Sequence, residues 1–243
     1  ELQDVKLRDK DRQDPDVELL QQNNLRLEAM KEAAMSYGAR GGLAMQTYRI
    51  REALAQKSAY LDRIYDFNRL LIPAPSGLLI EPPIINEALD SMIIEAGGQS
   101  AAVADRIIEI SRNARIVPVA RNWRAYLERD WGNLDEPPMV LRPENNEERR
   151  EWANLIAEGW REGEAQANAI FQSDLARLNQ DFTGMVRYRM LLAQGLVSQP
   201  FALHMDRGVT GNGQELVIGD RAVQITGPSL LQTGPNTWQP ANR

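Results

Sequence analysis

Apolar residues recur at helical spacing through the first quarter of the chain. Asp14-Pro15 is typical of a helix start, because Asp accepts backbone N–H groups at the cap and Pro fits the first helical position. The apolar stripe behind it contains Leu19, Leu20, Leu27, Met30, Ala34 and Met35. The spacing continues beyond Gly38–Gly42, so residues 15–66 are predicted to be helical.

The glycine cluster at Gly38–Gly42 interrupts this pattern. Glycines between helical segments allow a kink or the close approach of another backbone. The cluster lacks the Lys and Ser/Thr that would complete a phosphate-binding loop, so we interpret it as a packing feature.

A second and longer helix is predicted between residues 145 and 195. Asn145 with Glu148 three residues later resembles a capping box, which marks a helix start. Gly159 and Gly163 allow close contact with another element. The apolar face contains Trp152, Leu155, Ile156, Trp160, Ile170, Leu175, Leu178, Phe182, Met185 and Leu192. Such a face must be covered, and we expect part of the cover to come from another protein.

Short β-prone runs separated by turn-like residues fill residues 84–120 and 201–227. Residues 98–111 align without a gap on residues 213–226, with identical Gly, Gln, Asp, Arg and one Ile. Gly219-Asp220 favours a two-residue turn, so the alignment predicts a hairpin there and another around Asp105.

Two further turn signals extend this pattern. Asn212-Gly213 predicts that residues 201–210 pair ahead of the second copy in a three-stranded meander. Gly97-Gly98 predicts a similar meander before the first copy. The two meanders would form either one composite sheet or two small sheets.

These elements predict an α+β fold, in which N-terminal and central amphipathic helices pack on antiparallel β-meanders that contain a repeated hairpin. Residues 15–243 are expected to form a single domain that ends in an extended C-terminal tail. Residues 1–14 are almost wholly charged or polar and are predicted to be a flexible tether.

Charge and composition argue against several classes of function. The net charge of −6 disfavours a sequence-independent grip on nucleic acid, and the basic clusters at Arg149-Arg150 and at Arg187 with Arg189 are small. The absence of Cys excludes disulfides and thiol chemistry within this chain. No apolar run approaches the roughly 18–20 residues of a spanning helix. Any targeting segment is expected upstream of Glu1.

Candidate chemistry is sparse. His204 is the single histidine and cannot supply a multi-His metal site, so we interpret it as structural. Four acids, Glu144, Glu147, Glu148 and Glu151, fall at the start of the long helix, where they favour the positive end of its dipole. Glu158 and Glu162 are the acids that paired-carboxylate chemistry would use, and we interpret them as a solvated face. We predict no catalytic, cofactor-binding or metal site and no enzyme activity.

Several motifs in order resemble one known family. They are Ser36–Ala44, Leu61–Ile64, Trp123–Leu127, Gly159–Gly163 with Gln166-Ala167, Leu175–Leu178, Gly184–Arg189 and Leu191–Gln194. Between about Leu25 and Pro240 the chain resembles the DotC family, lipoproteins of Dot/Icm type IVB secretion systems with counterparts in related conjugation systems.

This resemblance implies a periplasmic, non-enzymatic protein of the outer-membrane core complex, held at the outer membrane by a lipid anchor upstream of Glu1. It implies assembly with DotD and DotH, in a multi-copy ring that exports effector proteins or conjugative DNA. It implies no cofactor, no direct contact with nucleic acid and no small-molecule substrate, and it assigns no partner-binding residue.

Two alternatives from other classes stay open. One is a periplasmic cell-wall hydrolase that uses Glu158 and Glu162 as its acid pair. The other is a periplasmic module that binds small ligands between helix and sheet.

Overall fold

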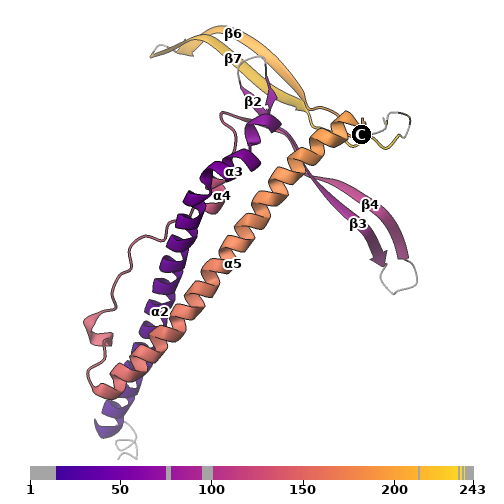
Figure 1. Ribbon diagram of the computed structural model, residues 1–243. Coiled ribbons are helices and arrows are strands. Elements are labelled where there is room, and N and C mark those ends of the chain that lie inside the picture. Colours follow the sequence, from indigo (N-terminus) through magenta and orange to yellow (C-terminus); the bar gives the residue numbers. More distant parts are fainter. Residues whose placement is uncertain are drawn as a thin grey trace, which may run out of the picture. The chain divides into compact units, whose positions relative to one another are not determined.

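The computed structural model describes residues 15–74, 78–94, 101–212, 214–234, 236 and 238 (Figure 1). The helices are α2 (Pro15–Gln56), α3 (Ser58–Ile64), α4 (Arg124–Leu127) and α5 (Asn146–Ala193), with 3-10 turns η1 (Phe67–Leu70) and η2 (Met139–Leu141). The strands are β1 (Ile72–Pro73), β2 (Leu79–Glu81), β3 (Ile84–Ile94), β4 (Ala101–Arg112), β5 (Arg115–Val117), β6 (Phe201–Asn212) and β7 (Glu215–Gly227).

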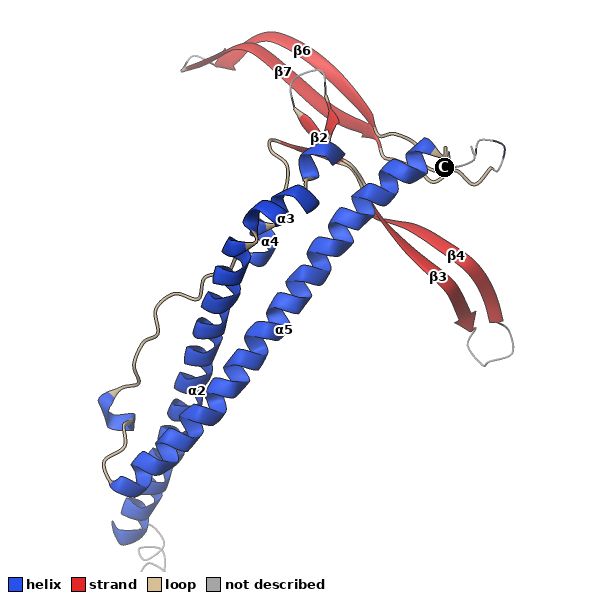
Figure 2. Cartoon of the chain, viewed as in Figure 1, coloured by secondary structure: helices blue, strands red, loops and turns tan. Residues whose placement is uncertain are grey.

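The predicted α+β fold class is confirmed, since 51% of the chain is helical and 26% is in strands (Figure 2). All strand pairs in the described ranges are antiparallel. The predicted tether at residues 1–14 lies outside the described residues, as do residues 95–100 and Gly213.

The chain divides into two compact units. The first contains α2 and Glu128–Ser173, and the second contains Lys57–Leu127 and the chain from Asp174 onward. Residues 146–173 of α5 therefore belong to the first unit and residues 174–193 to the second. The single domain expected from the sequence stays a prediction.

In the first unit, α2 and the first part of α5 run parallel with their backbones close together. Contacts advance together along both helices, from Arg26 with Glu148 to Gln46 with Asn168. A Cβ atom added at Gly38 would overlap the backbone of Ile156, and the other glycines of the helix pair, Gly42, Gly159 and Gly163, are as tightly packed. α2 continues through Gly38–Gly42. The sequence left open a kink or the close approach of another backbone, and the contacts confirm the close approach.

The predicted capping box at the start of α5 is confirmed. The Glu148 backbone N–H donates to Asn145 Oδ1 at 2.8 Å, and Asn145 Nδ2 donates to Glu148 Oε1 at 2.9 Å. Arg26 adds two hydrogen bonds to the same carboxylate. The Arg26 hydrogen bond, helped by the Glu144 backbone N–H, lowers the pKa of Glu148. Glu148 therefore serves both in the helix cap and as an anchor to α2.

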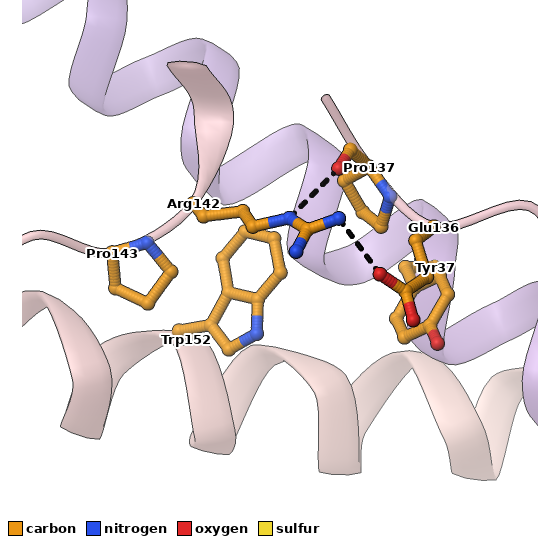
Figure 3. A pocket seen from close by; sticks show the side chains of 6 residues that line it. All are labelled: Tyr37, Glu136, Pro137, Arg142, Pro143 and Trp152. Atoms are coloured by element: carbon orange, nitrogen blue, oxygen red, sulfur yellow. Dashed lines mark hydrogen bonds and ion pairs between the residues drawn. The ribbon is translucent and has the colours of Figure 1, made fainter. Parts of the chain in front are cut away.

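The segment between α4 and α5 runs back along α2 as a proline-containing strap. Its residue Leu134 lies next to Gly41. Arg142 holds the strap in shape by donating to the Pro137 carbonyl at 3.0 Å and to Glu136 at 2.7 Å (Figure 3). A small cavity of about 180 Å³ lies between the strap and the aromatic rings of Tyr37 and Trp152.

The second unit has its core where the end of α5 meets the strands. Ile85, Tyr188, Leu191 and Val197 are buried together. Gly184 lets β3 approach the helix, because an added Cβ would overlap the side chain of Ile84. β1, β2 and β5 form a three-stranded sheet, of which β5 falls within the predicted β-rich range 84–120.

Two long hairpins, β3–β4 and β6–β7, correct the predicted repeat. Residues 101–111 of the first copy lie in one continuous strand, β4, and residues 215–226 of the second in another, β7, so the turns predicted at Asp105 and at Gly219-Asp220 are wrong (Figure 1). The three-stranded meanders are also wrong, because in the described ranges β3 and β4 form one two-stranded sheet and β6 and β7 form another. The pairing of residues 201–210 with the second copy is confirmed.

A β-bulge explains why Gly219 does not make a turn. Gly208 and Gly219 both have positive φ, at 67° and 75°, and the strand register shifts on both sides of Gly208. In the first hairpin Asp90 has a φ of 49° at the place that faces Asp105, between the Leu89–Arg106 and Ser91–Ala104 pairs. In both copies the repeated sequence therefore forms a strand, and the neighbouring strand has an irregular backbone at the place that faces the aspartate of the repeat.

We expect Gly163→Ala to destabilise the protein although alanine favours helices. The new Cβ would overlap the Ala39 carbonyl oxygen, and overpacking of this kind costs about 1–3 kcal/mol. Urea unfolding followed by circular dichroism measures the change. Glu162→Ala at the neighbouring exposed position is the control and should shift the unfolding free energy by less than about 0.5 kcal/mol. A stabilised Gly163→Ala variant would contradict the close helix contact.

Candidate functional site

Two buried carboxylates in the second unit share one guanidinium group. Glu81 on β2 is 3% exposed and Asp181 on α5 is 2% exposed. Arg121 donates to both Glu81 oxygens, at 2.7 and 2.6 Å, and to Asp181 Oδ2 at 2.5 Å. Arg115 makes a second pair with Glu81, and Arg112 a second pair with Asp181. Each buried acid is therefore bound by two arginines.

Tyr126 completes this network. Its hydroxyl donates to Asp181 Oδ2 at 2.7 Å and accepts a hydrogen bond from Arg121. Burial raises the pKa of Tyr126, and its hydrogen bond to Asp181 adds to the effect while Arg121 opposes it. Burial lowers the pKa of Arg121, but its hydrogen bonds to Glu81 and Tyr126 outweigh burial and leave it raised. A network whose acids are all paired holds α5, β2 and the segment before α4 together.

Residues of the recognised motifs make similar internal contacts. Trp123 and Arg124 both donate to Asp62 at 2.7 Å, and the Arg124 hydrogen bond lowers the pKa of that carboxyl. Arg187 donates to the Ile85 carbonyl, and Arg189 to the Leu71 carbonyl. Arg187 and Arg189, to which the sequence analysis assigned no role, therefore connect α5 to β3 and to the residue before β1.

The second hairpin exposes several apolar side chains close together. Val209, Leu216 and Ile218 are 61%, 68% and 77% exposed, and we call these three residues the distal patch. Val209 faces Ile218 across the strand pair, and Leu216 lies two residues from Ile218 on the same face. Between Gly208 and Gly219 the only charged residue is Glu215.

The hairpins also carry unpaired strand edges. In the described ranges each of β3, β4, β6 and β7 is hydrogen-bonded to one neighbouring strand. Unpaired edges are templates for pairing with another chain. Leu89 and Val103 on the first hairpin are exposed as well. Exposed apolar residues beside unpaired strand edges are typical of sites that bind a protein partner.

The residues considered for catalysis are not members of the buried network. His204 is exposed on β6 opposite Val223, and Glu158 and Glu162 are exposed on successive turns of α5. Among the described residues no group of three or more His, Cys, Asp or Glu is placed to hold a metal ion. None of the described helices is long and apolar enough to span a bilayer.

Comparison with known families identifies the chain. Residues 24–240 match a family described as type IV secretory system, conjugal DNA-protein transfer. Because the match covers most of the chain, the protein belongs to this family. No curated protein matches it.

We expect Arg121→Met to destabilise the fold more than Arg115→Met, although both arginines bind Glu81. The Arg121 side chain is 14% exposed and the Arg115 side chain 57%. Breaking a buried pair costs about 3–5 kcal/mol. An exposed pair contributes at most about 1 kcal/mol. Urea unfolding of both variants compares them, and equal losses would contradict the central place of Arg121.

Proposed function

We propose that the chain is a structural, non-enzymatic subunit of the outer-membrane core complex of a type IVB secretion system, the counterpart of DotC. It assembles in the periplasm with subunits of the DotD and DotH type, in several copies. A lipid anchor upstream of Glu1 holds it at the outer membrane. The assembly exports effector proteins or conjugative DNA.

The observation that carries this proposal is the exposed second hairpin. A single two-stranded sheet is at best marginally stable in water. Yet β6 and β7 pair over almost their whole length with the distal patch in solvent. A partner that covers the patch removes this apolar surface from water and completes the sheet edge. Membership of a secretion-system family is consistent with such a partner being another subunit.

The interior of the second unit supports a scaffold role. Its buried acids Glu81 and Asp181 are bound by arginines, so the charged groups that are out of water serve to fix elements in place. The acids Glu158 and Glu162 are exposed and carry no comparable support. Nothing in this arrangement favours the hydrolase over the scaffold.

The proposal is tested by replacing the distal patch with charge. Val209→Asp with Ile218→Asp places two carboxylates opposite each other on that face. We expect the variant to lose at least about 2 kcal/mol of binding to the DotD- and DotH-type subunits, as hot-spot residues do. Co-purification from the envelope of a strain that carries the whole system measures retention, and membrane fractionation measures placement at the outer membrane.

The matched control exchanges the two residues, Val209→Ile with Ile218→Val, and keeps the apolar area. This variant should co-purify like the natural chain. Circular dichroism must show that both variants are folded. If the charged variant retains its partners, or if the natural chain neither binds them nor reaches the outer membrane, the proposal is wrong.

A further inference from the structure

A second surface feature lies in the second unit, away from the distal patch. An open cavity of about 560 Å³ lies between β4 and the residues Leu231, Gln232, Thr233 and Trp238. Its walls are mainly apolar, formed by Ile108, Leu196, Leu231 and Trp238. The volume falls within the roughly 300–1,000 Å³ of small-molecule sites.

The walls of this cavity are held in place before any ligand arrives. Ile108, Leu196 and Leu231 pack against the core of the unit. The Gln232 N–H donates to the Leu196 carbonyl at 2.9 Å, and Trp238 Nε1 donates to the Gln232 carbonyl at 3.0 Å. A cavity with fixed apolar walls binds without first paying to order them.

Positive charge borders the cavity at one place. Arg106 lines it and pairs with Glu87, but Arg187 pairs with the same carboxylate at 2.9 Å. One negative charge therefore serves two guanidinium groups, which leaves a net charge of about +1.

The sidedness of the hairpin keeps other acids away from this border. The strand register places Glu87, Leu89, Arg106 and Ile108 on one face of β3–β4. Asp105 and Glu109 are each one residue from Arg106 or Ile108 along β4, and so belong to the opposite face. Among the described residues of these strands, Glu87 is the acid on the cavity side.

We propose that this cavity binds an anionic amphiphile, with an aliphatic chain against Ile108, Leu196, Leu231 and Trp238 and a carboxylate or phosphate paired with Arg106. The apolar walls suit the chain, and the surplus positive charge suits the head group. Carboxylate and phosphate both match the planar fork of a guanidinium. This site goes beyond the assembly role and does not depend on it.

The repeat supplies a matched control for the test. Arg221 on β7 aligns with Arg106 and is exposed, but it does not line the cavity. The full chain is titrated with dansyl-labelled undecanoic acid, which is then displaced by laurate, dodecyl phosphate or dodecanol. The titrations are repeated with Arg106→Gln, Arg221→Gln and Trp238→Ala, each checked for folding by circular dichroism.

We expect both anions to displace the probe more strongly than dodecanol does. Arg106→Gln should weaken the anions roughly tenfold, the worth of one charged hydrogen bond, and leave dodecanol unchanged. Arg221→Gln should bind all three as the natural chain does. Trp238→Ala should weaken all three, since it removes a wall. Stronger displacement by dodecyl phosphate identifies a lipid phosphate as the head group, and stronger displacement by laurate a fatty acid.

Failure would take one of three forms. The probe does not bind, dodecanol binds as well as the anions, or both arginine variants behave alike. Any of these overturns the proposed site. The Val209→Asp, Ile218→Asp variant separates this result from the assembly role, because it should bind the probe normally while it loses its protein partners.

Discussion

The pairing of Arg121 with two buried carboxylates is the interaction on which the second unit depends. Glu81 and Asp181 come from parts of the chain 100 residues apart, and one side chain brings them together. Buried acids without such a partner would cost several kcal/mol each. Their satisfaction fixes β2 against α5, and β3 begins three residues after Glu81. The base of the first hairpin is thus positioned by charge pairing as well as by apolar packing.

The two ends of β7 differ in burial. Val223 and Ile225, in the second half of β7, are partly buried, whereas the residues of the distal patch are exposed. A stable fold does not need such a strand pair to be so long. The length and apolar character of β6–β7 are therefore the features on which the proposed assembly role rests.

The sequence predicted the helices well because their signals are local. Capping at Asn145 and the apolar stripe of α5 need only neighbouring residues. The buried network was missed although its signal was visible: Asp174 and Asp181 fall on the same helical face as Leu178, Met185 and Tyr188. An acid on an apolar stripe needs a buried partner, but its identity depends on contacts far along the chain.

The repeat shows why the hairpin turns and the sites could not be predicted in the same way. A glycine with positive φ suits a two-residue turn and a β-bulge equally, and the choice is made by strand pairing over many residues. The two aligned arginines, Arg106 and Arg221, have different surroundings. Arg106 shares Glu87 with a second arginine beside an apolar cavity, whereas Arg221 is exposed opposite Asp206. Since the residues are the same and only their surroundings differ, the chemistry of each copy is set by what packs against it.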